Sequence, residues 1–252
     1  MSLEGRVALV TGGSRGIGRA VARALAEDGA DIAVHYNRDE EAAQKTVEAV
    51  SQLGRRALAV RAAIEDPEAL AVLVGKVREG LGPVGILINN AGVASRGRSV
   101  LKTEADELER LMRIHALGPH ELCKLVLPDM RKQERGDIVM VSSVATKYNA
   151  AGGAPYNMGK AAMESLALTL AAEERGHGIR VNVVAPGLVE TEMGSRLMKA
   201  TAGIDDLRQL DAQMPFGRVC QPEDIADTIR HLVSPRSAYT TGQRIEIDGG
   251  GQ

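Results

Sequence analysis

Aromatic residues are scarce in this sequence: its 252 residues include no tryptophan, one phenylalanine and four tyrosines. Tyr156 is therefore one of few phenols available for chemistry. Long apolar runs are also missing, and without a stretch of about 18 apolar residues no transmembrane helix is expected. The segment MSLEGRVALVTGG has only a short apolar run that leads into glycines, unlike the layout of a signal peptide. We therefore expect a cytoplasmic protein that does not contact membranes.

Neither sign of charge dominates, since the formal net charge is −2 and no long run of lysine or arginine occurs. This balance argues against a nucleic-acid-binding protein. The two cysteines, Cys123 and Cys220, are far apart and lack the spacing of metal ligands. We interpret them as buried or idle thiols in a reducing compartment, and we expect no metal site.

Apolar, β-branched runs alternate with longer helical patterns, which is typical of a parallel sheet built from βαβ units. One doubly wound α/β domain over residues 1–252 accounts for this order, and 188–215 is expected to be an insertion on the substrate side. The expected strands are 6–10, 31–36, 57–62, 85–89, 137–142, 180–185 and 243–248. The expected helices begin near Gly16, Asp39, Pro67, Thr103, Pro155 and Pro222.

The segment TGGSRGIG at residues 11–18 follows the first expected strand and opens the first expected helix. Its glycines Gly12, Gly16 and Gly18 permit a tight turn, a close approach of the backbone to a pyrophosphate, and close packing of helix on strand. The N-terminus of the helix then offers free N–H groups to phosphates. An ordinary strand–helix turn is the alternative, and the lack of a following Gly-Lys-Ser/Thr excludes a P-loop.

The end of the second expected strand bears on the choice between NAD(H) and NADP(H). Proteins that bind NAD usually place an acidic side chain there to hold the ribose 2′-hydroxyl. This sequence has Asn37 and Arg38 instead, and Asp39, followed by two glutamates, is more typical of a helix cap. Arg15 and Arg38 together suit a 2′-phosphate. We therefore favour NADP(H) over NAD(H).

Tyr156 and Lys160 are four residues apart, so in a helix the phenol and the ammonium group lie on one face. A tyrosine hydroxyl has an unperturbed pKa of ~10, which is too high for proton transfer at neutral pH. At ~4 Å and an effective dielectric constant of ~20, the ammonium favours the phenolate by up to roughly 4 kcal/mol. The pair is a candidate general acid/base, and two residues on a solvent-exposed helix are the alternative.

Several segments together resemble the short-chain dehydrogenase/reductase family over essentially the full chain. They are TGGSRGIG at 11–18, NNAG at 89–92, a serine, YNMGK at 156–160, APGLVETEM at 185–193 and TGQRIEIDGG at 241–250. Each motif is modest alone, but their shared order is specific. Within the family the chain is most similar to the 3-oxoacyl-[acyl-carrier-protein] reductases. The resemblance implies a single-domain Rossmann fold, with a seven-stranded parallel sheet and helices on both faces.

The resemblance also assigns roles to the expected site residues. Ser143, thirteen residues before the tyrosine, orients the substrate oxygen, and Tyr156 donates a proton to a carbonyl as hydride arrives from the nicotinamide. Lys160 holds the ribose hydroxyls and lowers the pKa of Tyr156. The implied cofactor site comprises Gly12, Ser14, Arg15, Gly16, Ile17, Gly18, Asn37, Arg38, Ile64, Asn90, Ala91, Gly92, Tyr156, Lys160, Pro186, Gly187, Val189 and Thr191.

Two positions depart from the family pattern. Members usually carry Asp-Val after the third strand, whereas this sequence has Ala63 and Ile64. A carboxylate for the adenine amino group is therefore missing, although Ile64 can still pack on adenine. Members also carry an asparagine in the helix before Gly118, whereas this sequence has His115. The family asparagine acts through its backbone carbonyl, which a local opening of the helix frees to bind a relay water beside the lysine.

We expect that opening to persist, because Pro119 has no N–H to donate and disturbs the preceding turn. The imidazole of His115 can also donate or accept a hydrogen bond, and its charge changes near pH ~6.5. His115 is therefore a candidate catalytic residue of the proton relay. The alternative is that it only packs beneath the site.

The expected function is NADP(H)-dependent reduction of a ketone to an alcohol, with Tyr156 as general acid/base and a 3-oxoacyl thioester on acyl carrier protein as substrate. A sugar, polyol or steroid alcohol dehydrogenase is the nearer alternative, and a non-catalytic NADP(H)-binding regulatory protein the more distant one. Segments 94–99 and 191–216 and the stretch after Tyr148 are expected to select the substrate. Segment 191–216 is either a mobile lid or a plain surface helix. The apolar helices expected at 103–133 and 155–176 favour a homotetramer.

Overall fold

A seven-stranded, wholly parallel sheet forms the centre of the computed structural model, which describes residues 2–251. Its strand order is β3-β2-β1-β4-β5-β6-β7. Strands β1, β2, β4, β5 and β6 are buried throughout, which explains why they read as continuous apolar runs. The strands are β1 (Val7–Val10), β2 (Asp31–Tyr36), β3 (Ala57–Arg61), β4 (Val84–Asn89), β5 (Gly136–Val141), β6 (Ile179–Pro186) and β7 (Arg244–Ile247).

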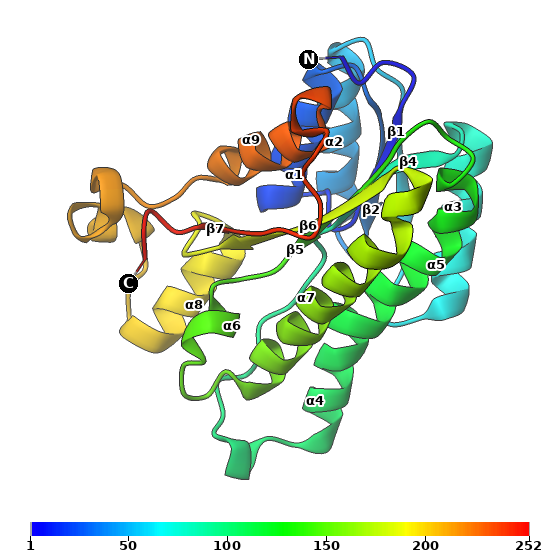
Figure 1. Cartoon of the computed structure of the whole chain (residues 1–252). Helices are drawn as coiled ribbons and strands as arrows, with labels where there is room; N and C mark the ends of the chain where they lie inside the picture. Colours follow the sequence, from blue (N-terminus) through cyan, green and yellow to red (C-terminus); the bar gives the residue numbers. More distant parts are fainter. Residues whose placement is uncertain (1, 252) are drawn as a thin grey trace.

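Helices cover both faces of the sheet, with α1, α2 and α9 on one face and α3, α5 and α7 on the other (Figure 1). Each face has its own apolar core, because successive strand residues point to opposite sides. The helices are α1 (Gly16–Glu27), α2 (Glu40–Gln52), α3 (Pro67–Gly80), α4 (Ala105–Met112), α5 (Gly118–Met130), α6 (Ala145–Tyr148), α7 (Ala154–Glu174), α8 (Glu192–Ala202) and α9 (Pro222–Val233).

Aspartates mark where two of these helices begin. The carboxylate of Asp39 accepts a hydrogen bond from the N–H of Ala42 (2.9 Å), and Asp66 caps α3 in the same way. Such a cap stabilises a helix by about 1 kcal/mol. The prediction that Asp39 is a helix cap is confirmed, and the predicted order of strands and helices is also confirmed.

The predicted helix at 103–133 is interrupted by a π-helical turn, η2 (Arg113–Leu117), between α4 and α5. There the N–H of Gly118 bonds to the carbonyl of Arg113, five residues back. In a regular α-helix the carbonyl of His115 would bond to the N–H of residue 119, and Pro119 has none. The expected opening of the helix at His115 is therefore present. The short helix α6, by contrast, was not predicted.

The connection at 188–215 contains α8 and a 3₁₀ turn, η4 (Leu207–Gln213). Its apolar residues Leu207 and Leu210 pack with Val219 in a small cluster of their own, apart from the two cores of the sheet. This segment therefore depends less on the central core than the rest of the chain does. In the part of the chain that the structure describes, no helix is long and apolar enough to cross a membrane.

Candidate active site

The carboxyl ends of β1 and β4 mark the point where the strand order reverses, because β2 and β3 lie beyond β1 and β5 to β7 lie beyond β4. In open parallel α/β sheets, ligands bind in the crevice at such a point. The glycine loop (residues 11–18) follows β1, and the NNAG segment (residues 89–92) includes the end of β4. Two of the predicted cofactor motifs therefore meet at this edge of the sheet.

The glycine loop has a backbone that requires glycine. Gly12 and Gly16 have φ values of +62° and +51°, and a Cβ on Gly18 would lie 2.1 Å from the carbonyl oxygen of Gly12. Ser14 is buried and Ile17 is half-buried, so the loop presents mainly backbone. Arg15, the N-cap of α1, makes no capping hydrogen bond with its side chain, so that cap does not occupy the first N–H groups of α1. The loop and the start of α1 thus form the cradle that a pyrophosphate needs.

The NNAG segment is fastened to the glycine loop. The hydroxyl of Thr11 accepts hydrogen bonds from the N–H groups of Asn90 (2.8 Å) and Ala91 (2.9 Å). The Nδ2 of Asn90 donates in turn to the carbonyl oxygens of Thr11 (2.8 Å) and Gly12 (3.3 Å). The side chain of Asn90 therefore supports the loop directly, which is more than its predicted position beside the cofactor.

His35 on β2 is a supporting residue that the sequence analysis missed. Its ring is buried, with Nδ1 3.1 Å from the N–H of Gly12 and Nε2 3.1 Å from the carbonyl oxygen of Ala62. Burial lowers the pKa of His35 to about 4, so the ring is neutral at pH 7. Because a carbonyl only accepts, Nε2 carries the proton and Nδ1 accepts from the glycine loop. The available signal was a polar residue inside an otherwise apolar strand.

Arg15 connects the glycine loop to α8. Its Nη1 lies 2.8 Å from Oε2 of Glu192 and 3.9 Å from Oδ2 of Asp39, and its side chain is 48% exposed. A Cβ on Gly16 would also lie 3.2 Å from Cγ2 of Thr191, just before α8. Arg15 is one of the two arginines predicted to bind the 2′-phosphate. In this structure it is paired with a carboxylate of α8.

The other residues that were predicted to contact the adenosine differ in how far they are exposed. Asn37 and Arg38 are exposed after β2, and the carbonyl of Asn37 accepts a hydrogen bond from Nε of Arg61 (3.0 Å). Ile64 is only 5% exposed, because it belongs to the apolar core and packs where Gly118 has no side chain. The predicted packing of Ile64 on adenine is thus limited to the small part of its surface that stays accessible.

The segment after β6 leads into α8 and is held by backbone hydrogen bonds. The carbonyl of Pro186 accepts from the N–H of Val144 (3.0 Å), and the N–H of Gly187 donates to the carbonyl of Ile247 (2.9 Å). Val189 is buried, while Thr191 caps α8 by accepting from the N–H of Gly194 (3.1 Å). The predicted nicotinamide-side residues therefore form an ordered turn between β6 and α8.

The three predicted catalytic residues Ser143, Tyr156 and Lys160 converge where β5 ends and α7 begins. Lys160 follows Tyr156 by one turn, and its Nζ lies 5.8 Å from the centre of the Tyr156 ring. The side chain of Ser143, just after β5, hydrogen-bonds with Tyr156. Lys160 is only 3% exposed, and its Nζ donates to the carbonyl oxygen of Val141 (2.7 Å). A solvent-exposed pair, the alternative weighed from the sequence, is thus excluded.

Burial disfavours the charged forms of both residues. Desolvation raises the pKa of Tyr156, and its hydrogen bond with Ser143 offsets this only in part. Desolvation also lowers the pKa of Lys160 to about 8, against the opposing charge of Glu164. The net pKa of Tyr156 is therefore raised and not lowered, because desolvation dominates and the ammonium of Lys160 is directed at Val141. Tyr156 is protonated at neutral pH, which is the form that a proton donor requires.

His115 lies in contact with both of these residues. It is fully buried, and its ring meets that of Tyr156 edge-on at a centroid distance of 5.2 Å. Its Nε2 lies 2.9 Å from the carbonyl oxygen of Val93, so Nε2 carries the proton and Nδ1 is an acceptor. That Nδ1 has no hydrogen-bond partner among residues 2–251. A Cβ on Gly92 would lie 3.3 Å from Nδ1 and 3.7 Å from Nζ of Lys160, so the acceptor is near the lysine.

Burial, together with the charge of Lys160, lowers the pKa of His115 to about 3. The prediction that its charge changes near neutral pH is therefore wrong. The imidazole stays neutral over the range in which enzymes usually operate. It is a fixed acceptor close to the site and not merely packing beneath it.

A nicotinamide dinucleotide fits these residues. The cradle of positive-φ glycines, the start of α1 without a side-chain cap and the buried lysine are the elements that its phosphates and ribose require. Over residues 2–251, no group of three or more His, Cys, Asp or Glu side chains is placed to hold a metal ion.

Comparison with known proteins agrees with this geometry. A family model described as "Enoyl-(Acyl carrier protein) reductase" matches residues 12–252. The chain is 36% identical to the 3-oxoacyl-[acyl-carrier-protein] reductase FabG of Vibrio cholerae, over 99% of this chain and 98% of that protein. The chain belongs to the short-chain dehydrogenase/reductase family.

Members of the short-chain dehydrogenase/reductase family that are similar to this chain differ in substrate. The L-rhamnose 1-dehydrogenase (NAD(P)(+)) of Sphingomonas sp. (strain SKA58) is 35% identical, over 98% of this chain and 96% of that protein. The angucycline C-6 ketoreductase LanV, solved with bound NADP, has a TM-score of 0.88 at 34% identity, covering 98% of this chain and 96% of that chain. The predicted family and Rossmann-type fold are therefore confirmed, and these relatives together do not single out one substrate.

Proposed function

We propose that this member of the family is an NADP(H)-dependent reductase of ketones, and that its substrates are 3-oxoacyl thioesters on acyl carrier protein. The observation that carries the proposal is the half-buried, protonated Tyr156, which lies beside Ser143 and the buried Lys160 where β5 ends and α7 begins. The relative named 3-oxoacyl-[acyl-carrier-protein] reductase supports the substrate class, and the relative named ketoreductase supports the reaction.

The chemistry follows from the protonation states of these side chains. When bound, NADPH supplies the hydride that the ketone carbon accepts. The phenol of Tyr156 gives its proton to the substrate oxygen as negative charge develops there, and the hydroxyl of Ser143 orients the same oxygen. The ammonium of Lys160 holds the ribose hydroxyls and stabilises the phenolate that remains.

The tyrosine then needs a new proton, and the opened helix offers a route. The backbone carbonyl of His115 lies at the π-helical turn, where the proline at 119 cannot supply the usual N–H. A water held by that carbonyl would sit beside Lys160, as the family resemblance implies. The neutral Nδ1 of His115 is a second acceptor for such a water.

The preference for NADP(H) rests on the charges that surround the adenosine end. Arg15 reaches the end of β2, within 3.9 Å of Asp39, and Arg38 is exposed after that strand. Asp39 is used as a helix cap, so it is a poor ligand for a ribose 2′-hydroxyl. These features favour a phosphate over a hydroxyl at that position.

Oxidation of a sugar is the second candidate, because the L-rhamnose dehydrogenase is nearly as similar as the acyl-carrier reductase. A ranking of kcat/KM separates the two. The set should contain 3-oxoacyl thioesters, sugars, polyols and a steroid ketone, each with both cofactors. The highest value is expected for a 3-oxoacyl thioester with NADPH. A higher value for rhamnose or a polyol would replace the proposed substrate, and no turnover on any compound would leave only a binding protein.

We also propose a homotetramer. On α7, Met158 and Leu168 are each 50% exposed, and Leu117 on η2 is 56% exposed. Such apolar side chains suit burial against further copies of the chain across two-fold axes. Light scattering should give about four times the chain mass of 26.7 kDa. A monodisperse species at the mass of one chain would contradict this.

A further inference from the structure

A network of hydrogen bonds and ion pairs lies beside the proposed catalytic residues, and Glu164 is at its centre. Glu164 follows Lys160 by one turn of α7, so both side chains lie on the same face. Its Oε1 lies 2.5 Å from the hydroxyl of Ser142 and 2.9 Å from that of Thr146. These two residues flank Ser143 in the chain, so Glu164 holds both ends of the segment that carries it.

Arg244 on β7 contacts the same groups from the other side. Its Nε lies 3.1 Å from Oε1 of Glu164, and its Nη2 donates to the hydroxyl of Thr146 (3.0 Å). Nη2 also lies 3.4 Å from the carbonyl oxygen of Ser143. One guanidinium therefore contacts the carboxylate, the threonine and the backbone of the serine.

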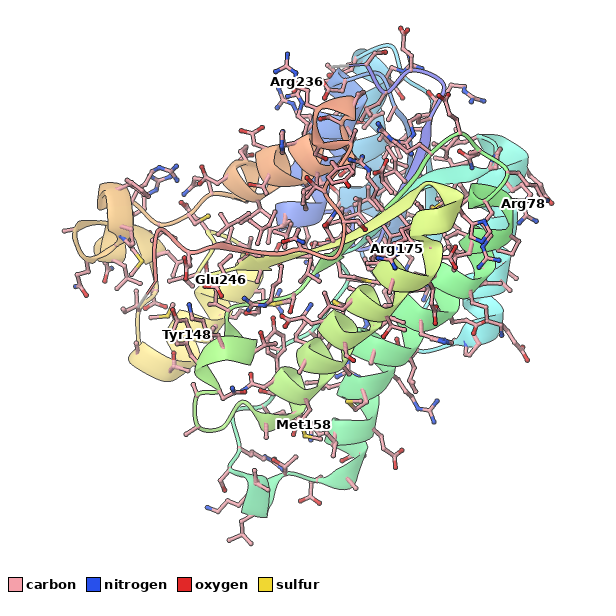
Figure 2. All side chains as sticks on the ribbon, viewed as in Figure 1. Arg78, Tyr148, Met158, Arg175, Arg236 and Glu246 are labelled. Atoms are coloured by element: carbon pink, nitrogen blue, oxygen red, sulfur yellow. The ribbon has the colours of Figure 1, made fainter. Side chains whose placement is uncertain are left out.

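The network continues to α6, the short helix that follows the serine. Nη1 of Arg244 lies 2.5 Å from Oε1 of Glu246, and Oε2 of Glu246 lies 2.8 Å from Nζ of Lys147. Figure 2 labels Glu246 on β7 and Tyr148 on α6, on the same side of the molecule. The three residues thus tie α6 to β7, and Arg244 ties both to α7.

The pair of Glu164 and Arg244 is largely shielded from solvent, which makes it stronger than a surface ion pair. The side chain of Glu164 is 16% exposed and that of Arg244 is 24% exposed. Hydrogen bonds to charged groups are about twice as strong as those between neutral groups, and they fix geometry. The segment from Ser142 to Tyr148 is therefore held at several points by charged partners.

Glu164 also affects the charge of the lysine. Its carboxylate raises the pKa of Lys160, which burial alone would lower further. The other titratable groups around the ammonium are Tyr156 on α7 and His115 on η2, and both are neutral at pH 7. Arg244 faces Glu164 from β7 and keeps the carboxylate in place. Glu164 is therefore the carboxylate that counters the burial of Lys160.

We propose that Glu164 is a positioning residue of the active site, which holds the Ser142–Tyr148 segment against α7 and places a carboxylate one turn from Lys160 on the same helix face. This inference rests on the proposed function, because it assumes that Ser143, Tyr156 and Lys160 act together. It assigns to Glu164 two separable effects, one on geometry and one on charge.

The test compares Glu164→Gln with Glu173→Gln, an exposed glutamate of the same helix, as the matched control. Removing the negative charge lowers the pKa of Lys160, so the lysine loses its proton at a lower pH than in wild type. The Kd for NADP⁺ should therefore begin to rise about half a pH unit or more earlier in a titration from pH ~7 to ~9.5. In Glu164→Gln, kcat for ketone reduction should also fall by about tenfold or more. Glu173→Gln should match wild type in both measurements.

A second variant separates geometry from charge. Arg244→Gln leaves Glu164 charged but loosens the serine segment, so kcat should fall without the shift to lower pH in NADP⁺ binding that Glu164→Gln should show. The variant also keeps the test open if Glu164→Gln does not fold. Loss of melting temperature in Glu164→Gln, with kcat and the pH dependence of binding unchanged, would overturn the proposal. A wild-type protein that binds NADP⁺ but reduces no ketone would instead contradict the proposed function, and the binding titration would still test the charge effect.

Discussion

The two sides of the crevice are held in different ways. On the cofactor side, buried residues fasten the glycine loop, with Thr11, His35 and Asn90 making its hydrogen bonds. On the substrate side, α8 is held largely by exposed ion pairs, such as that between Lys199 and Asp205, whose side chains are both 71% exposed. Surface pairs contribute about 0–1 kcal/mol each, so these ion pairs add little to the stability of α8. The glycine loop is thus fixed by hydrogen bonds within the fold, whereas α8 has mainly exposed polar contacts.

The substrate side also exposes apolar surface. Met193 and Leu197 on α8 are 40% and 49% exposed, and Phe216 is 88% exposed in a left-handed conformation with φ of +59°. A non-glycine residue in that region is held there by its surroundings at some cost. Such a surface suits an apolar substrate chain better than a sugar, which agrees with the proposed thioester.

The largest expected effect is on kcat, when the phenol of Tyr156 is removed. Tyr156→Phe removes the proton donor but keeps the ring, so kcat should fall by about 10²–10⁴-fold while the Kd for NADPH changes little. Steady-state rates and fluorescence titration measure the two quantities. A loss of less than tenfold would show that another group donates the proton.

Lys160→Met should weaken both cofactor binding and catalysis. The ammonium is predicted to hold the ribose hydroxyls and to stabilise the phenolate, so the Kd for NADPH should rise and kcat should fall, each by about tenfold or more. Both are measured on the purified variant after its fold has been checked by circular dichroism. If only one of the two quantities changes, the double role assigned to Lys160 is wrong.

Arg15 links the glycine loop to α8, so substitutions there test the two sides of the crevice together. Replacing Arg15 and Arg38 by glutamine should weaken NADPH binding by roughly tenfold and NADH binding much less, because only NADPH has a 2′-phosphate. Glu192→Gln should have the opposite sign: it releases Arg15 from its ion pair and should tighten NADPH binding a few-fold. Equal changes in Kd for NADPH and NADH would show that Arg15 and Arg38 do not bind the 2′-phosphate.

The smallest expected effect is at His115. The relay carbonyl belongs to the backbone and the imidazole is neutral, so His115→Asn should keep at least about a tenth of the wild-type rate. The pH–rate profiles of the two proteins should have the same shape between pH ~5.5 and ~7.5, since no histidine titrates there in the site. If wild type is inactive and the variant restores turnover, His115 has disabled the relay.

Most of the cofactor side could be predicted from the sequence, because the motifs that form it are short and contiguous in the chain. Buried parallel strands read as apolar runs, and a loop that needs positive φ reads as glycine. The serine network could not be predicted, because Glu164 and Arg244 are paired only by the fold. The raised pKa of Tyr156 was missed for a related reason: spacing shows which charge is near, but burial decides which effect wins.

The pH dependence of the forward and reverse reactions in one protein tests the central claim most directly. If the phenol of Tyr156 is the proton donor, the rate of ketone reduction should fall as pH rises through its ionisation, because the donor is lost. Alcohol oxidation should rise through the same ionisation, because the phenolate is then the base. Both the fall in ketone reduction and the rise in alcohol oxidation should disappear in Tyr156→Phe. Reduction that rises with pH, or the same ionisation in the variant, would contradict the account.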